Sequence, residues 1–285
     1  MKASAPRCHV GTCSWSFDEW RGAFYPEHLA RHDWLRWYAA RFTAVEADSV
    51  FYGVPGPEVL AHWAEVVPRG FRFCVKAPKG LTHGHPVGGK EGELGAFLDA
   101  MAVLGERLGC VLFQFPPRLR ADAHFHEVAS FVAGLPAGVR YAVEFRDRSW
   151  DSRRVEERLA AKGVARVWDD AGPVGECGAC LHRPRTAPHA YVRLLGDLST
   201  KYDAAGQCRH HYTRLMWDRG VEIEAWAQRL RAEHGLEEVF VLANNHYEGF
   251  APATARRAAA ALGVALPEPP PEEKPPVQGE LGFAE

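Results

Sequence analysis

The chain alternates short apolar runs with segments of helical periodicity along almost its whole length. Eight apolar runs occupy residues 8–15, 42–51, 71–76, 110–115, 140–146, 164–170, 190–195 and 238–245. Amphipathic segments with a repeat of about 3.6 residues follow seven of them, at residues 33–42, 57–67, 91–108, 122–135, 151–162, 221–234 and 251–262. Strands that alternate with helices pair in parallel through crossover connections. The pattern therefore predicts an α/β fold, a (β/α)8 TIM barrel.

The length and composition fit one barrel followed by a tail. The 285 residues are 47% hydrophobic, which is enough for a single sizeable core. We therefore expect one barrel domain over residues 1–265. Residues 266–285 are rich in proline and charge and poor in apolar side chains, which predicts a disordered tail.

The sequence shows neither a membrane span nor an export signal. No apolar stretch approaches the roughly 18 residues needed to cross a bilayer, and the N-terminus lacks an apolar signal region. These features predict a cytoplasmic protein with no membrane partner. The formal net charge is -2, so any affinity for nucleic acid would have to come from a local basic patch.

Polar side chains gather at the C-terminal ends of the apolar runs, whereas the opposite ends carry mostly loop residues. The polar residues are Glu46, Asp48, Lys76, Gln114, Glu144, Arg146, Asp170, Arg193, Asn244 and Asn245. In a TIM barrel the C-terminal strand ends form one face, and active sites lie there. We therefore expect these side chains to meet in a common mouth.

Two carboxylates and three cations in this set indicate chemistry on an anionic ligand. Glu46 and Glu144 lie on the second and fifth runs, so they can face each other across the lumen and act as general acid and base. Lys76, Arg146 and Arg193 suit a phosphate or a developing oxyanion. In the alternative interpretation, the acidic and basic side chains only neutralise one another inside the barrel.

Histidines and further carboxylates raise the question of a metal ion. Of the 14 histidines, His83 and His246 follow the third and eighth runs and can reach the mouth. The carboxylates that could join them are Glu46, Glu144, Asp169 and Asp170. This set is sufficient for one divalent metal ion at most.

Aromatic residues lie near the ends of the first two runs. Trp15 and Tyr52 could stack on bases or sugars at the mouth, or they could fill gaps between the barrel and its helices. The sequence favours neither role over the other.

The seven cysteines are expected to be thiols, because their number is odd and the chain shows no export signal. The candidates for a structural zinc site are Cys177, Cys180, His182 and Cys208. Their C-x-x-C spacing is typical of zinc ligands, although the chain has no matching second half-site. A redox pair and incidental loop cysteines are the alternatives.

Seven ordered motifs in the chain carry a resemblance to a known family. They are GTCSWSFDEWRGAFYP, VEADSVFYGVP, FRFCVKAPKGLTH, LFQFPP, VEFRDRSW, YVRLLG and NNHYEGFAPATA. Together they resemble the DUF72 (YecE-like) family of barrel proteins, from about Val10 to Leu262. The resemblance implies the barrel fold but no particular activity, because the family's name records an unassigned function. Two features depart from the family pattern: Asp48 stands where the family commonly has Asn, and the cysteine-containing segment is extra.

The tail ends in a short pattern, Q-x-x-L-x-F, formed by Gln278, Leu281 and Phe283. It resembles the peptide by which bacterial polymerases and repair proteins dock on the sliding clamp. The Leu and Phe side chains would fill an apolar pocket, Gln would add a directed hydrogen bond, and the proline-rich spacer would give reach. The pattern predicts a sliding clamp as a partner.

These features favour a hydrolase of phosphodiesterase or nuclease type that acts on nucleic acid or another phosphorylated ligand, and the tail points toward DNA repair. The predicted catalytic residues are Glu46, Glu144, His83 and Asp170. The predicted ligand-binding residues are Trp15, Asp48, Tyr52, Lys76, Gln114, Arg146, Arg193, Asn244, Asn245 and His246. A glycoside-hydrolase-like enzyme with two carboxylates and a non-catalytic binding or adaptor barrel are the alternatives.

Overall fold

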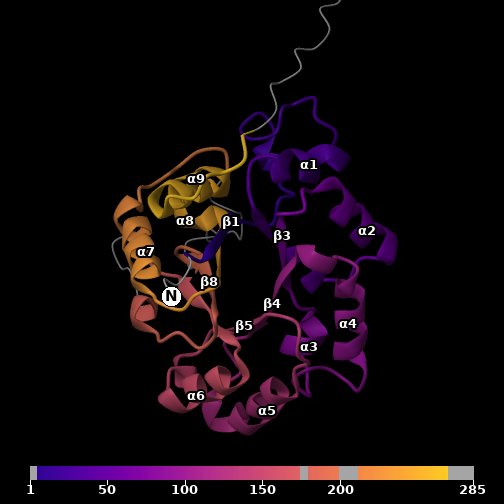
Figure 1. Cartoon of the computed structure of the whole chain (residues 1–285), viewed down its shortest axis with the longest axis vertical. Coiled ribbons are helices and arrows are strands. Elements are labelled where there is room, and N and C mark those ends of the chain that lie inside the picture. The colour runs from indigo at the N-terminus through magenta and orange to yellow at the C-terminus, as the bar shows by residue number, and fades with distance from the viewer. Residues whose placement is uncertain (1–4, 174–178, 199–210, 269–285) are drawn as a thin grey trace, which may run out of the picture.

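The computed structural model describes residues 5–173, 179–198 and 211–268, which form a parallel α/β barrel (Figure 1). The strands are β1 (Arg7–Cys13), β2 (Ala44–Ala47), β3 (Arg72–Lys76), β4 (Leu108–Phe115), β5 (Tyr141–Phe145), β6 (Ala165–Arg166), β7 (Trp168–Asp170), β8 (His189–Leu194) and β9 (Glu238–Ala243). They form one sheet in the order β6-β5-β4-β3-β2-β1-β9-β8-β7, and each pair runs parallel. The predicted barrel is confirmed.

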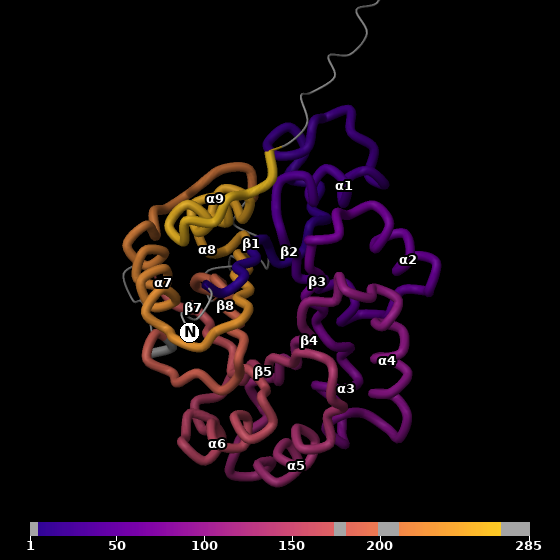
Figure 2. Tube along the Cα trace, viewed as in Figure 1, coloured from indigo at the N-terminus to yellow at the C-terminus, as the bar shows by residue number. Residues whose placement is uncertain are grey.

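The sixth predicted strand is divided into β6 and β7. Only Val167 separates them, and β6 pairs with β5 while β7 pairs with β8. The backbone N–H of Val167 still donates to the carbonyl of Val143 at 2.9 Å, so the chain itself closes the ring at this point. On the other side, β1 lies between β2 and β9, which makes the first and last strands neighbours (Figure 2).

Helices surround the strands on the outside of the ring (Figure 1). In the described part of the chain they are α1 (Trp34–Ala39), α2 (Pro57–Val66), α3 (Lys79–His83), α4 (Glu93–Ala102), α5 (Ala121–Gly134), α6 (Arg153–Lys162), α7 (Gly220–Ala232), α8 (Asn245–Glu248) and α9 (Ala251–Leu262). Sequence periodicity does not reveal α3 and α8, because so short a helix offers no repeat to detect. None of the described helices combines the length and apolar character needed to span a bilayer.

One helix boundary differs from the prediction. The segment 91–108 is helical only to Ala102, and Leu108 already begins β4. Beyond the helix end, Gly105 adopts a left-handed backbone (φ 53°), which glycine reaches without a steric penalty, and it begins a short 3-10 helix (Gly105–Arg107) that leads into β4. The apolar stripe that continues past Ala102 therefore belongs to a turn and to the start of a strand.

Strand side chains alternate between two separate cores, as the two-residue repeat of a strand requires. Outward-facing residues such as Val45, Phe73, Phe113 and Val241 pack against the helices. A second core fills the lumen and comprises Cys13, Ala44, Cys74, Cys110, Leu112, Ala142, Ala165, Val167, Ala187, Tyr191, Phe240 and Leu242. The lumen is thus packed rather than an open pore.

The contact between β1 and β2 depends on a glycine. A Cβ atom at Gly11 would lie 1.8 Å from the carbonyl oxygen of Ala44, so no larger residue fits there. Tyr38 from α1 ties the two strands together, because its hydroxyl donates to the Ala44 carbonyl at 3.0 Å and accepts from the Thr12 N–H at 2.7 Å. This register places Cys13 of β1 opposite Glu46 of β2.

Candidate functional site at the barrel mouth

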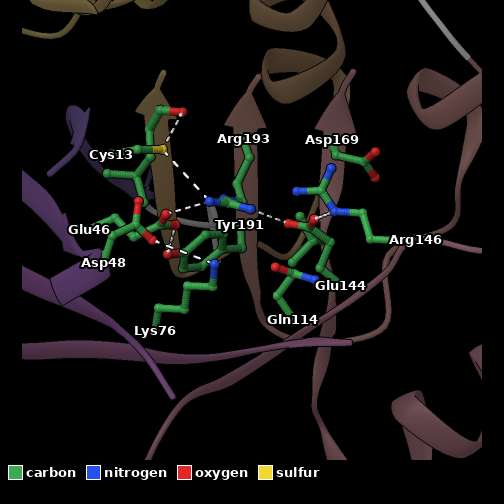
Figure 3. Close-up of polar contacts among 12 residues, drawn as sticks. Cys13, Glu46, Asp48, Lys76, Gln114, Glu144, Arg146, Asp169, Tyr191 and Arg193 are labelled. Atoms are coloured by element: carbon green, nitrogen blue, oxygen red, sulfur yellow. Dashed lines mark hydrogen bonds and ion pairs between the residues drawn. The ribbon is translucent and has the colours of Figure 1, made fainter. Parts of the chain in front are cut away.

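Polar side chains converge inside the barrel at the C-terminal ends of the strands, a region we call the mouth (Figure 3). The strand register places Cys13 opposite Glu46, Gln114 opposite Glu144, and Asp169 opposite Arg193. Alternate residues of a strand point to the same face, so inward-facing residues at one register level form a layer across the lumen. The polar residues at these strand ends therefore lie close together, as the sequence predicts.

Arg193 on β8 is the centre of the mouth. Its Nη2 donates to Glu46 Oε1 at 2.6 Å, and its Nη1 donates to Glu144 Oε2 at 2.5 Å. The hydroxyl of Tyr191 donates to the second oxygen of Glu46 at 2.7 Å, and Arg146 forms an ion pair with the second oxygen of Glu144. One guanidinium therefore joins the two carboxylates across the lumen, and both carboxylates have partners on each oxygen.

The two glutamates are ionised. Burial alone raises the pKa of Glu46, but the charge of Arg193 and the hydrogen bonds from Tyr191 and Arg193 outweigh it, so this pKa is lowered. At Glu144, the charges of Arg146 and Arg193 overcome burial and lower the pKa to about 2. Neither carboxylate is suited to accept a proton at neutral pH. Glu144 has an arginine on each oxygen, and Glu46 has Arg193 on one oxygen and the Tyr191 hydroxyl on the other.

Asp48 behaves differently from the two glutamates. Burial and the negative charge of Glu46 raise the pKa of Asp48 to about 7, against the opposing effect of Arg193 and Lys76. The Lys76 Nζ is 4.0 Å from Asp48 Oδ1, and the two side chains are 15% and 30% exposed, whereas Glu46 and Glu144 are fully buried. Asp48 and Lys76 thus form the outer, solvent-reachable level of the mouth.

His83 lies at the rim beside this pair. Its ring makes an edge contact with Phe51 at 5.0 Å between centroids, and Lys76 lies over the same Phe51 ring at 4.4 Å. Partial burial and the neighbouring charges of Lys76, Arg118 and Lys79 lower the pKa of His83 to about 4. The imidazole is therefore neutral at pH 7 and can serve as a hydrogen-bond donor or acceptor.

Several predicted site residues do not join this cluster. Asp170 accepts hydrogen bonds from Trp226 at 3.0 Å and Tyr247 at 2.7 Å, in the layer between the barrel and its helices. The side chain of Asn245 is buried, and it accepts a hydrogen bond from Trp20 Nε1 at 3.2 Å. Both residues therefore stabilise the fold.

The segment after β9 is also used for structure. The side chain of Asn244 caps α8 by accepting from the N–H of His246 at 3.0 Å. His246 is buried, and its Nε2 lies 3.1 Å from the hydroxyl of Tyr212. These contacts orient the turn into α8 rather than present its side chains to the mouth.

The two predicted aromatic ligand contacts lie in different environments. Trp15 packs edge-on against Trp63 of α2 at 5.0 Å, in the gap between barrel and helix. Tyr52 is 87% exposed and contacts Phe51 edge-on at 5.2 Å. Tyr52 is therefore the aromatic side chain that is open to a ligand, whereas Trp15 is mainly used in packing.

Sequence reasoning missed Cys13 and Tyr191 and ranked Asp170 above Asp169. The two-residue repeat contains the missing signal: Tyr191 shares a face with Arg193, and Asp169 shares a face with Val167 inside the barrel. Asp169 accepts a hydrogen bond from Arg183 Nη1 at 2.6 Å. The inward face of each strand, rather than its last polar residue, identifies the members of the mouth.

Three potential metal-binding side chains come together at the mouth. The donor atoms of Cys13, Glu46 and Asp48 lie within 4.8 Å of one another. However, burial and the charge of Glu46 raise the pKa of Cys13 well above its usual value, so the thiolate that a metal needs is disfavoured. Both oxygens of Glu46 are also taken by Arg193 and Tyr191. This donor set fits a proton-binding site better than a metal centre.

Some predicted residues lie outside the described part of the chain. These are Cys177 and Cys208 of the zinc candidates, and Gln278, Leu281 and Phe283 of the clamp-binding pattern. Cys180 and His182 belong to a short 3-10 helix (Ala179–His182), in which His182 is exposed. The zinc site and the clamp contact therefore stay predictions.

The geometry defines a parallel α/β barrel protein with a charged cluster at the carboxyl ends of its strands, and comparison with known proteins gives its family. The chain belongs to the family described as "Protein of unknown function DUF72", whose model matches residues 9–278. The resemblance inferred from the seven motifs is confirmed.

Relatives and solved structures agree with this assignment. The chain is 31% identical to UPF0759 protein YecE of Escherichia coli K12 over 177 residues, which span 58% of this chain and 60% of that protein. It is 27% identical to UPF0759 protein YunF of Bacillus subtilis 168, over 85% of this chain and 89% of that one. A DUF72 crystal structure from Thermotoga maritima has a TM-score of 0.73 at 25% identity and covers 90% of this chain and 99% of its own. One from Enterococcus faecalis has a TM-score of 0.71 at 23% identity, with 94% and 100% coverage, and supports the fold.

Proposed function

We propose that the mouth is the active site of a hydrolase that acts on a phosphorylated ligand, with Asp48 as its acid and base. The observation that supports this is the place of Asp48 between the buried Glu46 and Lys76, whose Nζ is 4.0 Å from Asp48 Oδ1. In this place burial and the charge of Glu46 raise the pKa of Asp48 to about 7, whereas the pKa of Glu46 is lowered. General acids and bases work best when their pKa is near the operating pH. Carboxyl groups driven apart in pKa by their surroundings are typical of catalytic pairs.

The charge balance of the mouth favours an anionic ligand. Asp169 is paired with Arg183 and leaves no net charge. When Asp48 is neutral, Glu46 and Glu144 supply two further negative charges against three positive charges on Lys76, Arg146 and Arg193. The two arginines are committed to the glutamates, so the excess positive charge lies on Lys76. We infer that its ammonium group holds a phosphate oxygen, and that the exposed ring of Tyr52 offers a stacking surface for a base or sugar.

The proposed reaction uses one proton cycle. Protonated Asp48 gives its proton to the leaving oxygen as the phosphate ester bond breaks, and a water molecule forms the new bond to phosphorus. The proton that this water loses returns the Asp48 carboxylate to its acid form. Glu46, Glu144 and Arg193 do not exchange protons in this scheme. Their mutual hydrogen bonds fix Glu46, whose charge raises the pKa of Asp48.

A substrate screen tests this proposal. The purified chain is incubated with small phosphate esters, with abasic, nicked and single-stranded DNA, and with oligosaccharides. We expect phosphate ester hydrolysis that falls roughly 100- to 10,000-fold in Asp48→Asn. Lys76→Met should raise KM more than it lowers kcat, because Lys76 acts in binding.

Matched controls decide between the proposal and its alternatives. Asp122→Asn removes an exposed carboxylate on α5 and should leave turnover unchanged. Full activity in Asp48→Asn would contradict the acid–base role. Turnover of oligosaccharides alone would favour the glycoside-hydrolase alternative, and no turnover of any substrate would favour a binding barrel.

We also propose that the tail docks on a sliding clamp through Gln278, Leu281 and Phe283. The support is the sequence pattern alone. Deletion of residues 277–285 should abolish binding to a bacterial clamp in surface plasmon resonance and leave the melting temperature unchanged. A double Leu281→Ala and Phe283→Ala variant should do the same, and retained binding in either form would contradict the docking proposal.

A further inference from the structure

A second cluster of metal-binding side chains lies outside the barrel mouth. It consists of His85 in the loop after α3, and His124 and Glu127 on α5. Glu127 Oε2 is 3.1 Å from His124 Nδ1, and Glu127 Oε1 is 3.7 Å from His85 Nδ1. The two imidazole rings lie nearly parallel, with centroids 5.3 Å apart. Two imidazoles therefore direct their Nδ1 atoms toward one carboxylate.

The spacing of these atoms matches the coordination sphere of a small divalent cation. Zinc binds imidazole nitrogen and carboxylate oxygen at about 2.0–2.2 Å in tetrahedral geometry, which separates neighbouring donor atoms by roughly 3.3 Å. The separations of 3.1 Å from His124 Nδ1 to Glu127 Oε2 and 3.7 Å from His85 Nδ1 to Glu127 Oε1 lie on either side of that value, so a carboxylate that binds through both oxygens would face both imidazoles. All three donor atoms lie within 4.8 Å of one another. An ion at their centre requires only small side-chain movements.

The cluster is held in place by packing and by a backbone hydrogen bond. The N–H of Val87 donates to Glu127 Oε1 at 2.7 Å, which orients the carboxylate as outer partners orient metal ligands. Val87 is itself buried, so this loop is anchored in the core. Gly88 adopts a left-handed backbone (φ 91°), and a Cβ there would lie 2.6 Å from the ring of Phe131 on α5. The loop therefore lies directly against the helix that supplies the other two ligands.

We propose that His85, His124 and Glu127 bind one divalent transition-metal ion of the zinc class. Two imidazoles and a carboxylate are a donor set that suits zinc and its neighbours better than magnesium or calcium. His85 is the most exposed of the three, with 63% of its side chain open to solvent, which leaves room for water in the remaining position. The ion ties the loop after α3 to α5.

This site is separate from the mouth but connected to its rim. His83, two residues before His85, is the last residue of α3 and contacts Phe51 at the rim. Arg118 also donates a hydrogen bond to the backbone carbonyl of His83. Metal binding fixes the loop on the other side of His83 and thereby restricts the segment that borders the mouth.

Metal titration of the full chain tests the proposal. The purified, chelator-treated protein is titrated with Zn²⁺ by calorimetry and with Co²⁺ by absorption spectroscopy. We expect one ion bound by nitrogen and oxygen, seen as a Co²⁺ ligand-field spectrum without a thiolate charge-transfer band. The titration is repeated in a Cys177→Ser and Cys180→Ser background, so that the cysteine segment cannot supply the ligands.

Histidine variants locate the ion. The double variant His85→Ala and His124→Ala should bind Zn²⁺ more than about 100-fold more weakly, because loss of ligands exceeds the effect of losing outer partners. His126→Ala removes an exposed histidine from the same helix and should bind as tightly as the parent. Zn²⁺ should raise the melting temperature of the parent and of His126→Ala only. Equal affinity in the double variant, or no spectrum of the nitrogen and oxygen type, would overturn the proposal.

Discussion

Both ends of the barrel bury carboxylates among cations, but the two ends do so in different ways. At the N-terminal end of the strands, the buried Glu238 is surrounded by His9 at 2.9 Å, Arg140 at 2.7 Å, Arg72 at 3.7 Å and Arg7 at 3.8 Å. Burial raises the pKa of Glu238, but its hydrogen bond with His9 and the surrounding positive charge outweigh burial and lower it. This end has one carboxylate and an excess of cations.

The mouth instead places three carboxyl groups close together. Arg193 satisfies Glu46 and Glu144, and Asp48 is left next to the charge of Glu46. Burial and that charge raise the pKa of Asp48 to about 7. The comparison teaches that a buried carboxylate in direct contact with cations has a lowered pKa. A carboxyl group that lies beside another carboxylate, with a lysine only at 4.0 Å, has its pKa raised to about 7.

The largest expected effect comes from breaking the centre of the mouth. Arg193→Met leaves Glu46 and Glu144 buried without their shared cation, which should lower the free energy of unfolding by about 3–5 kcal/mol. Urea denaturation measures this change. Arg153→Met, which removes an exposed pair with Glu157, serves as the control and should change it by less than about 0.5 kcal/mol. Equal effects in both variants would show that the buried network contributes nothing.

A smaller loss is expected at the opposite end of the barrel. Glu238→Gln leaves Arg140 and His9 without their carboxylate, but 37% of the Arg140 side chain is exposed and reaches water. We expect a loss of about 2 kcal/mol in urea denaturation. Turnover at the mouth should be unchanged, because no residue of this cluster belongs to it. If Glu238→Gln lost turnover but not stability, the Glu238 end would act in turnover rather than in folding, and the proposed difference between the two ends would be wrong.

The free energy of unfolding should depend on pH in opposite ways at the two ends of the barrel, because the pKa of Asp48 is raised and that of Glu238 is lowered. The folded-state pKa of Asp48 is about 7 and the ordinary value is 3.8, so ionising Asp48 costs more in the folded chain. Stability associated with this group is fully present below about pH 4 and is lost as pH rises through 7. Relative to the parent, Asp48→Asn should therefore gain roughly 2–3 kcal/mol between about pH 5 and 8, because the slope of about 1.4 kcal/mol per pH unit acts over about two pH units.

Glu238, Glu46 and Glu144 have lowered pKa values, so their contributions have the opposite sign. They are present above the ordinary glutamate value and are lost as the pH falls through their folded-state values. Glu238→Gln should thus keep the parent's slope between about pH 5 and 8. Parallel curves for the parent and Asp48→Asn over that range would contradict the raised pKa of Asp48.

The sequence predicts the barrel well because strand and helix periods are local properties. The sequence also predicts that Glu46 and Glu144 lie close together, because polar residues at the ends of parallel strands meet at one face of the barrel. The cluster around Glu238 cannot be predicted in this way, because it lies at the N-terminal ends of the strands. Glu238 and His9 lie 229 positions apart along the chain, and only the pairing of β1 with β9 brings them together.

The chemistry of the mouth depends on distances that no local pattern contains. Asp170 was preferred to Asp169 because it ends its run, yet the closing of the ring at Val167 sets which aspartate faces inward. The raised pKa of Asp48 likewise depends on its burial and on the charge of Glu46 beside it. The sequence therefore predicts the level of the mouth, whereas the burial and distances of the folded chain single out Asp48 as the carboxyl group with the raised pKa.

The smallest expected change in stability comes from loss of Lys76. This substitution tests how far Lys76 sets the pKa of Asp48. Lys76 lowers the pKa of Asp48, so Lys76→Met should raise that pKa further above its ordinary value. Carbon-13 NMR of the Asp48 carboxyl, assigned with Asp48→Asn, measures the shift. Because Lys76 is partly exposed and 4.0 Å from Asp48, the unfolding free energy should change by less than about 1 kcal/mol. Lys79→Met removes a lysine at the start of α3 and should leave the Asp48 titration where it is. An unchanged Asp48 pKa in Lys76→Met would mean that burial and the charges of Glu46 and Arg193 set this pKa without a contribution from Lys76.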